Sequence, residues 1–258
     1  MEKITIRPSS ISTFVNCNYK WFRHHIKGDP VIPNIRMTVG TAVHKGAEVG
    51  YTEKMVRGSL PPLSVMTDAA IETFHEKLKE DEPQRDDTPL NDWEKTIVTD
   101  IDLYAPIMKT VTPVAVEKRY EVRLNNPHIE SVAGTLDIVL RGGVGDIKTT
   151  ARKATPSKYA LQLSTYALLA SKIENKIYNT AEIHNIVHDR DIYVMPLQLK
   201  IEQARFVINN MIDKVNAYFD GIASGETLFS GNPASPLCSS KYCELYNECP
   251  FVKGGVKW

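Results

Sequence analysis

The segment 131–149 constrains the fold of this chain more than any other stretch of its sequence. Residues 131–140 are rich in apolar and β-branched side chains, Gly142 and Gly143 provide a turn, and residues 144–149 form a second β-prone run. Two such runs separated by a short glycine turn predict a β-hairpin. The other predicted elements are organised around this hairpin.

The hairpin is predicted to carry charged side chains close together. Side chains alternate between the two faces of a strand, so Asp146 and Lys148 are expected on one face and Ile147 in the core. Asp137, on the partner strand, reaches the same face if the register allows it. Two carboxylates beside one ammonium favour a bound cation, and carboxylate oxygens suit Mg²⁺ or Mn²⁺. The alternative is an exposed ion pair of little energetic value, since Asp-x-Lys is a common sequence.

The order of several motifs resembles that of the RecB-like branch of the PD-(D/E)xK nuclease superfamily. The resemblance covers almost the whole chain and rests on four motifs: Gly40-x-x-x-His44, Gly134-x-x-Asp137, Asp146-Ile147-Lys148-Thr149 and Gln162-x-x-x-Tyr166. One departure is the second acid, which is Asp here and Glu in many relatives. The superfamily pattern accepts both residues.

This resemblance implies an α/β fold with a restriction-endonuclease-like core, a mixed central β-sheet flanked by helices, and a helical N-terminal insertion. It implies that Mg²⁺ or Mn²⁺ is bound by His44, Asp137, Asp146 and the Ile147 carbonyl. Lys148 would assist the attacking water, and two residues of a following helix would organise the site and its DNA. The implied catalytic residues are Asp137, Asp146, Lys148, Gln162 and Tyr166.

Two residues outside the hairpin need separate consideration. Residues 36–57 read as a helix on which Gly40 and His44 lie one turn apart, so a close approach of backbone at the glycine would let the histidine reach inward. A helical histidine alone is more often a core or surface group, and the other motifs favour ligation here. Glu117, on a strand predicted over 114–124, occupies a position where relatives often have an extra acid. We expect it to be a solvated strand carboxylate.

The chain has four cysteines, Cys17, Cys238, Cys243 and Cys249, and the first falls within a helix predicted over 9–25. In a reducing cytosol such a set holds a metal more often than it forms disulfides. Four thiolates suit tetrahedral zinc or an iron–sulfur cluster. The resemblance favours a 4Fe-4S cluster, because one N-terminal and three C-terminal cysteines are the arrangement of the iron–sulfur RecB-like nucleases, including the small CRISPR-associated members and the AddB nuclease domain. The long spacing between Cys238 and Cys243 leaves structural zinc open.

Composition limits the remaining possibilities. The formal net charge of the 258 residues is zero, so any DNA binding must come from local patches rather than from a global field. Arg152, Lys153 and Lys158 follow the hairpin and are expected to contact phosphates, although loop lysines are often only solubilising. The sequence has no long apolar run and no signal peptide, so we expect a soluble, cytoplasmic protein with no membrane partner.

The predicted organisation is a single nuclease domain over residues 1–258. Further helices are expected over 64–80, 91–111, 158–173 and 200–222, and further strands over 181–188 and 191–197. Within the domain, we expect a helical insertion over 31–112, a nuclease core over 113–222, and a four-cysteine metal site that joins 1–30 to 225–258.

These features predict a metal-dependent DNA exonuclease that hydrolyses phosphodiester bonds at DNA ends, with single-stranded ends favoured and with low sequence specificity. Its expected setting is recombination, repair or CRISPR adaptation. One alternative is a non-cleaving DNA-end-binding module of a larger assembly, and another is a zinc-stabilised structural protein. The sequence leaves open a homo-oligomer and partner proteins from recombination or CRISPR systems.

Overall fold

The computed structural model describes residues 3–252, and the chain divides into two compact units. The central unit comprises Ile32–Tyr120 and Thr135–Leu199. The terminal unit comprises the described parts of residues 1–31, 121–134 and 200–258. We describe each unit by itself.

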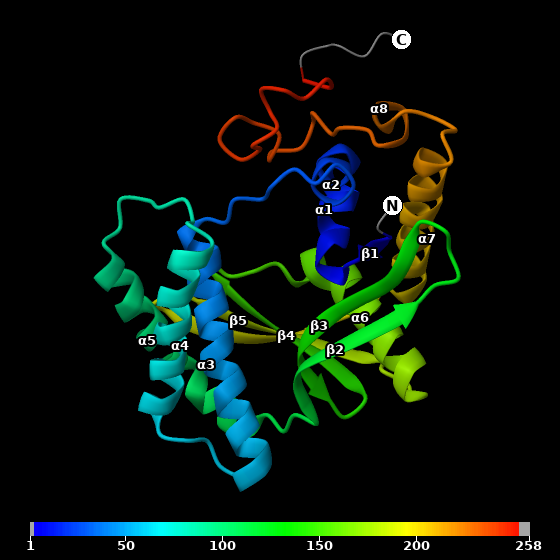
Figure 1. The fold of residues 1–258 in the computed structure, drawn as a ribbon. Helices are drawn as coiled ribbons and strands as arrows, with labels where there is room; N and C mark the ends of the chain where they lie inside the picture. The colour runs from blue at the N-terminus through cyan, green and yellow to red at the C-terminus, as the bar shows by residue number, and fades with distance from the viewer. Residues whose placement is uncertain (1–2, 253–258) are drawn as a thin grey trace. The chain divides into compact units, whose positions relative to one another are not determined.

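Three long helices form one layer of the central unit. They are α3 (Ile35–Arg57), α4 (Leu63–Glu80) and α5 (Leu90–Thr110), and they lie side by side (Figure 1). Glycines on α3 allow this close packing. A Cβ built on Gly50 would lie 2.4 Å from a side-chain atom of α5 and 2.5 Å from one of α4.

The strands of the central unit form a mixed sheet. The predicted hairpin is confirmed as an antiparallel pair of β3 (Ile129–Leu140) and β4 (Gly143–Thr150), and β2 (Ala115–Arg123) also pairs with β3. On its other edge β4 pairs in parallel with β5 (Thr180–Val187), which pairs antiparallel with β6 (Asp191–Leu197). This mixed α/β architecture is the predicted fold class.

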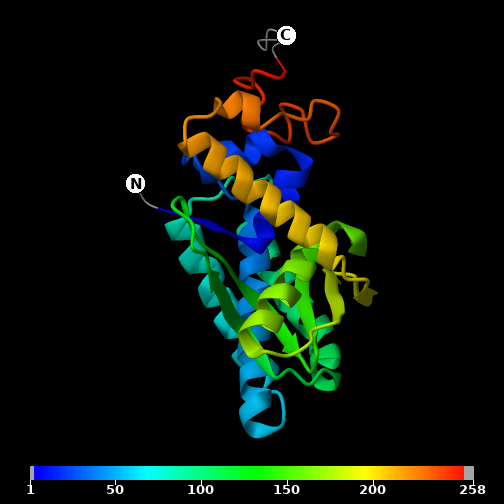
Figure 2. The same ribbon diagram turned by 90° about the vertical axis from the view of Figure 1, so that its right-hand side faces the viewer.

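The central sheet has helices on both faces. Ile147 of β4 is only 2% exposed and belongs to the hydrophobic core that the sheet forms with α3, α4 and α5. Asp146, its neighbour on the opposite face, accepts a hydrogen bond from Gln162 of α6 (Ala160–Glu174). The helix α6 follows the short η2 (Pro156–Tyr159), and Figure 2 shows it in front of the strands.

Buried polar contacts fix the helical layer to the sheet. The Tyr104 hydroxyl of α5 bonds to Nδ1 of His184 on β5 and lies 2.9 Å from the Tyr51 hydroxyl of α3. Asp100 of α5, which is fully buried, lies 2.6 Å from Nδ1 of His188. Because unpartnered polar groups are costly in a core, these contacts define one arrangement of helices on strands.

Lys54 provides a first testable prediction. Its ammonium donates hydrogen bonds of 2.8, 2.7 and 2.6 Å to the carbonyls of Met108, Lys109 and Val111, which lie at the C-terminal end of α5. We expect Lys54→Met to lower the free energy of unfolding by about 1–3 kcal/mol, because it removes the shared donor of these carbonyls. Urea denaturation measures the change. The exposed Lys79→Met is the matched control, and equal stabilities of the two variants would contradict this role.

In the terminal unit, β1 (Ile4–Ile6) pairs in parallel with the first part of β3. A short η1 (Pro8–Ser10) leads into α1 (Ile11–Asn16) and α2 (Asn18–His25). The C-terminal part of the unit contains α7 (Ile201–Phe219) and α8 (Gly225–Leu228), and both are drawn in orange in Figure 1.

The helix predicted over 9–25 is interrupted at Cys17. This residue has extended backbone angles, with φ of −158° and ψ of 101°, and it separates α1 from α2. The expectation that it lies within a helix is therefore wrong. The Asn18 side chain donates a hydrogen bond to the Phe14 carbonyl. Such side-chain hydrogen bonds compete with the helical ladder and favour a break.

Aromatic stacking holds α2 in the terminal unit. The rings of Phe22 and Phe229 stack with centroids 4.7 Å apart, and Tyr218 of α7 contacts Phe22 edge-on at 5.0 Å. In α7, Met211 is fully buried, whereas Phe206 is 73% exposed.

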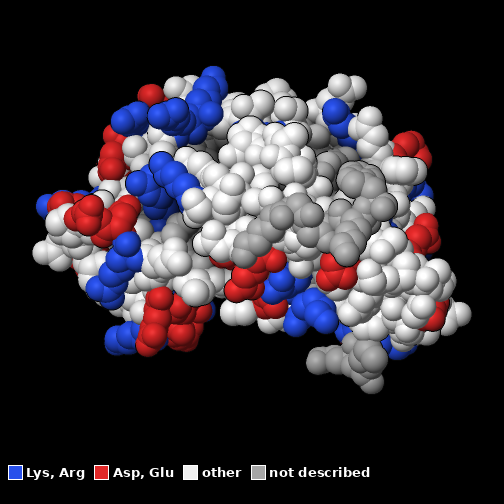
Figure 3. Space-filling model, turned by 90° about the horizontal axis from the view of Figure 1, so that it is seen from above, with Lys and Arg blue, Asp and Glu red and all other residues white. Residues whose placement is uncertain are grey.

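Positive and negative side chains share the surface of the protein (Figure 3). Figure 3 shows Lys and Arg side chains intermixed with Asp and Glu side chains on the face viewed from above, in keeping with the zero formal net charge. Among residues 3–252, no helix is both long and apolar enough to cross a membrane.

Candidate active site

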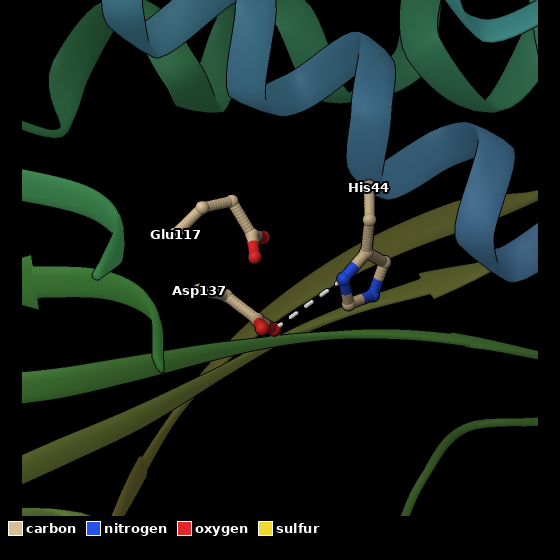
Figure 4. A group of neighbouring side chains, drawn as sticks. All are labelled: His44, Glu117 and Asp137. Carbon is tan, nitrogen blue, oxygen red and sulfur yellow. Dashed lines mark ion pairs between the residues drawn. The ribbon is translucent and has the colours of Figure 1, made fainter. Parts of the chain in front are cut away.

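Three side chains from separate elements converge in the central unit. Ligand atoms of His44 on α3, Glu117 on β2 and Asp137 on β3 all lie within 4.8 Å of one another (Figure 4). His44 Nδ1 is 3.6 Å from Asp137 Oδ2. One imidazole and two carboxylates suit Mn²⁺, and the carboxylates also suit Mg²⁺. The donor set therefore fits a divalent cation.

Gly40 explains how α3 brings His44 into this group. A Cβ built on Gly40 would lie 2.8 Å from Thr149 Oγ1, closer than real Cβ atoms approach other heavy atoms. The glycine thus lets α3 lie against the end of β4. Since His44 follows one helical turn later, its side chain falls on the same face. The predicted role of the Gly40-x-x-x-His44 spacing is confirmed for packing, and ligation itself stays a prediction.

Glu117 is the member of this group that sequence reasoning placed outside the site. The expectation of a solvated carboxylate is wrong, because Glu117 is half-buried and faces His44 and Asp137. Its φ of +44° is in the left-handed region, a strain of about 1–3 kcal/mol for a non-glycine residue. Burial, followed by the charge of Asp137, raises the pKa of Glu117 to about 7.

A second cluster is formed by the Asp146–Lys148 pair of β4. Asp146 is 2% exposed, and its Oδ1 accepts hydrogen bonds from Lys148 Nζ at 2.9 Å and from Gln162 Nε2 at 3.2 Å. Its Oδ2 is 2.7 Å from the same ammonium, yet it is buried and accepts no hydrogen bond of good geometry. This oxygen is thus available to a further electrophilic partner.

The charges of this cluster depend on one another. Burial raises the pKa of Asp146, although the Lys148 ammonium opposes the rise. Burial lowers the pKa of Lys148, but the carboxylates of Asp146 and Asp137 outweigh it and leave that pKa raised. Lys148 is therefore an ammonium at neutral pH, able to donate hydrogen bonds but not to accept a proton.

Asp137 links the two clusters, and Tyr166 is buried near them. Asp137 Oδ2 accepts a hydrogen bond of 2.8 Å from the Ile147 amide. Tyr166 is 5% exposed, and burial raises its pKa, with further contributions from the charges of Asp137 and Asp146. The structure thus brings the predicted site residues together within the central unit. Metal ligation by Asp146 and by the Ile147 carbonyl stays a prediction.

A groove of about 790 Å³ opens beside these side chains. Its lining includes Arg36, Thr41, His44 and Lys45 from α3 and Lys148 from β4. A space of this size is in the range of sites that bind small molecules, about 300–1,000 Å³. A ligand in the groove would reach the histidine and the catalytic lysine candidate at the same time.

The three residues predicted to contact DNA lie between β4 and α6. Arg152, Lys153 and Lys158 are all exposed. The Lys153 ammonium lies 4.1 Å from the centroid of the Tyr193 ring. Their role in DNA binding stays a prediction.

A family model described as the PD-(D/E)XK nuclease superfamily matches residues 5–250, a span that includes the acidic site and all four cysteines. The chain belongs to this superfamily. The fold class and the nuclease character implied by the resemblance are thereby confirmed.

A solved structure shares the fold of this nuclease. A candidate exonuclease from Eubacterium rectale matches with a TM-score of 0.58 over 92% of this chain and 87% of that chain, at 12% identity, which shows a shared fold. The solved protein SSO0001 aligns over 95% of this chain and 96% of that chain at 17% identity, with a TM-score of 0.38. No curated protein matches this nuclease.

The four cysteines of the nuclease line one cavity of about 260 Å³ in the terminal unit. All four are free thiols. Burial raises the pKa of Cys238, and neighbouring Cys249 and Cys17 add to the rise. Cys17, whose backbone is extended between α1 and α2, lines this cavity together with the three C-terminal cysteines.

The spacing of these sulfur atoms bears on what the cavity could hold. Tetrahedral zinc with Zn–S bonds of about 2.3 Å holds its sulfur atoms about 3.8 Å apart. Within residues 3–252, which include every cysteine, no three cysteine sulfur atoms lie within 4.8 Å of one another. The cysteines share one cavity, and within the described residues they do not form the tight three-sulfur group that a bound zinc ion would hold.

Contacts that need no metal also tie α2 to the cysteine segment. Glu244, next to Cys243, lies 2.8 Å from Lys20 Nζ and 2.6 Å from His24 Nε2. Sequence reasoning did not identify Glu244, because its partners lie more than two hundred positions earlier.

Proposed function

We propose that this protein is a divalent-metal-dependent deoxyribonuclease that acts as an exonuclease on DNA ends. The convergence of His44, Glu117 and Asp137 beside the buried Asp146–Lys148 pair carries this proposal. PD-(D/E)XK nucleases typically use divalent metals, and the solved neighbour from Eubacterium rectale is described as a candidate exonuclease. We place the activity at single-stranded ends, in recombination, repair or CRISPR adaptation.

In this proposal each residue has a role that follows from its chemistry. His44, Glu117 and Asp137 would hold Mg²⁺ or Mn²⁺, together with Asp146 Oδ2, which accepts no hydrogen bond. The bound ion would polarise the scissile phosphate and stabilise charge on the leaving oxygen. The Lys148 ammonium donates a hydrogen bond that orients the attacking water. Gln162 keeps the Asp146 carboxylate in place through its 3.2 Å hydrogen bond.

Low sequence specificity follows from how the groove is lined. The lining includes Arg36 and Lys45, whose charges suit the phosphate backbone, and Asn34 and Thr41, whose polar groups can hydrogen-bond to phosphate or sugar. Contacts of this kind position a strand without reading its bases.

The test is incubation of the anaerobically purified protein with end-labelled single-stranded and double-stranded DNA in Mn²⁺, with EDTA as control. We expect metal-dependent release of short products, faster from single strands. DNA binding without cleavage would favour a non-cleaving end-binding module. Failure to bind or cleave either substrate would overturn the proposal.

The raised pKa of Glu117 predicts a pH dependence of metal binding. Glu117 is protonated below about pH 7, so a proton competes with the cation at this ligand. We expect the affinity for Mn²⁺ to fall about tenfold from pH 8 to pH 6 through Glu117 alone. Titration of free Mn²⁺ by electron paramagnetic resonance measures this change.

Glu117→Gln isolates the contribution of this carboxylate. The variant should bind Mn²⁺ more weakly at pH 8 and should show a flatter pH profile than the unmodified protein. The exposed Glu76→Gln is the matched control and should keep both properties. An unchanged profile in Glu117→Gln would exclude Glu117 as a ligand.

We also propose that Cys17, Cys238, Cys243 and Cys249 hold a 4Fe-4S cluster with a structural role. Four thiolates are the ligand set of such a cluster, as they are of tetrahedral zinc. The shared cavity of about 260 Å³ supports a common ligand for all four thiols. Structural zinc is the alternative that metal analysis distinguishes.

A further inference from the structure

A row of three side chains crosses the central sheet next to the candidate active site. Lys148 of β4 is in register with Asn185 of β5, and Asn185 is in register with Tyr193 of β6. Residues in register on neighbouring strands place their side chains on the same face of a sheet. This face also carries Asp146, so the row extends the candidate active site across two further strands.

Both the oxygen and the nitrogen of the Asn185 side-chain amide form hydrogen bonds that fix the segment 150–154. The residue is fully buried. Its Nδ2 donates to the Lys148 carbonyl at 3.1 Å and to Thr150 Oγ1 at 2.7 Å, and its Oδ1 accepts from the Ala154 amide at 2.7 Å. A single side chain thus fixes the main chain at the catalytic lysine candidate and both ends of the following loop.

The interior of this loop is fixed in turn. Thr150 Oγ1 donates a hydrogen bond of 2.7 Å to the Arg152 carbonyl, so the chain of hydrogen bonds continues from Asn185 into the loop. The Lys153 ammonium rests 4.1 Å from the centroid of the Tyr193 ring, within the range of a cation–π interaction. Two exposed basic side chains, Arg152 and Lys153, therefore project from a loop whose backbone is held by a buried amide.

We propose that Asn185 and Tyr193 are positioning residues that hold the loop 150–154 as a seat for a second backbone phosphate of the DNA strand, adjacent to the phosphate that Lys148 meets. This inference rests on the proposed nuclease function and names the part of the substrate that the loop binds. A strand anchored at a neighbouring phosphate is oriented for the reaction at the scissile one. The anchor is independent of base identity, since its cations contact the phosphate backbone.

A side-chain amide at position 185 can both accept from the Ala154 amide and donate to the Lys148 carbonyl. A carboxylate at position 185 could accept from the Ala154 amide but could not donate to the Lys148 carbonyl. An alanine would leave these buried polar groups without their partner. Both substitutions should release the loop without altering His44, Glu117 or Asp137.

The experiment measures binding of a fluorescein-labelled single-stranded oligothymidine in Ca²⁺, over a series of salt concentrations. The variants are Asn185→Ala, Thr150→Val, which keeps the shape of the side chain but removes the hydroxyl link, and Tyr193→Leu. Loss of one phosphate contact should lower the slope of log affinity against log salt by about 0.7 and weaken binding about fivefold in 0.1 M salt. Mn²⁺ affinity should be unchanged in all three variants, and Tyr193→Phe should recover the affinity lost in Tyr193→Leu.

A double variant separates positioning from general loss of structure. If Asn185 acts through the loop, adding Lys153→Gln to Asn185→Ala should cause less further loss than Lys153→Gln causes alone. Lys79→Gln, on the exposed face of α4, removes the same charge elsewhere and should leave the salt slope unchanged. The Thr150 side chain is only partly buried, so Thr150→Val is expected to fold even if Asn185→Ala does not. It tests the same hydrogen-bonded link between Asn185 and the loop.

The outcomes distinguish this inference from the proposed function. If the unmodified protein cleaves DNA and the three variants keep its salt slope, the phosphate seat is wrong and the nuclease assignment stands. Fully additive losses in the double variant would also overturn the positioning role. If the unmodified protein neither binds nor cleaves DNA, both proposals fall together.

Discussion

Replacing Asp146 with asparagine is expected to lower the rate of DNA cleavage about 10²–10³-fold, the scale of losing a preorganised electrostatic group. Asparagine keeps the size of the side chain and can still accept a hydrogen bond from Lys148 Nζ. It removes the negative charge that raises the pKa of Lys148 and the buried Oδ2 that lacks a hydrogen bond. Cleavage of end-labelled DNA under single-turnover conditions in Mn²⁺ measures the loss.

The stability of the same variant separates catalysis from folding. Burial raises the pKa of Asp146 in the folded state, so the folded protein binds this proton more tightly than the unfolded chain does. The stabilisation from that proton is present below the unfolded pKa and is lost as pH rises through the folded pKa. At pH 8 burial of this charge opposes folding while its ion pair with Lys148 favours folding, so Asp146→Asn should change the unfolding temperature only slightly.

Two results would count against this assignment. Cleavage at an undiminished rate would show that Asp146 takes no part in the reaction. A large fall in the unfolding temperature at pH 8 would show that its charge is structural. The exposed Asp102→Asn, on α5, is the matched control and should change neither quantity.

The parts of the fold that depend on local periodicity could be predicted from the sequence. Two β-prone runs around a glycine turn predicted the hairpin, and strand alternation predicted Ile147 as a core residue, which the structure shows to be 2% exposed. The spacing of Gly40 and His44 predicted that another segment comes close at the glycine, and the structure shows this segment to be the end of β4 at Thr149. Each of these predictions required knowledge of one element and its period only.

The parts that depend on backbone exceptions or on register could not be predicted in this way. Glu117 enters the site through a left-handed backbone conformation that strand alternation does not anticipate. Cys17 leaves its helix because a neighbouring asparagine competes for a helical carbonyl. Asn185 and Tyr193 reach the loop after β4 only through the register of three strands, which the sequence of any one strand leaves undetermined.

Replacing Cys243 with serine is expected to remove the bound metal and to lower the stability of the protein together. The cysteine cavity joins Cys17 to a segment more than two hundred positions later, and a shared ligand there closes a very long loop. In the entropy description, a cross-link over about a hundred residues contributes on the order of 4–5 kcal/mol, and this loop is longer. We expect the loss of folded yield to be correspondingly large.

The measurement combines metal analysis, a visible absorption spectrum and thermal unfolding of anaerobically purified protein. Iron with acid-labile sulfide and a broad visible absorption identify a 4Fe-4S cluster, whereas zinc in a colourless protein identifies the alternative. Glu244→Gln is the matched control, because it weakens the contacts with Lys20 and His24 but leaves every thiol in place, so it should keep the metal.

Contacts other than a metal also hold the terminal unit together. In the terminal unit, α2 is held by aromatic stacking of Phe22 on Phe229 as well as by the Glu244 contacts, so some order should survive loss of the metal. The thiols that line the cavity of about 260 Å³ are not joined by disulfides, so a bound metal would be the link between them. Full thermal stability in Cys243→Ser would therefore show that no structural metal bridges the four cysteines. Loss of stability without loss of metal would instead assign Cys243 to packing alone.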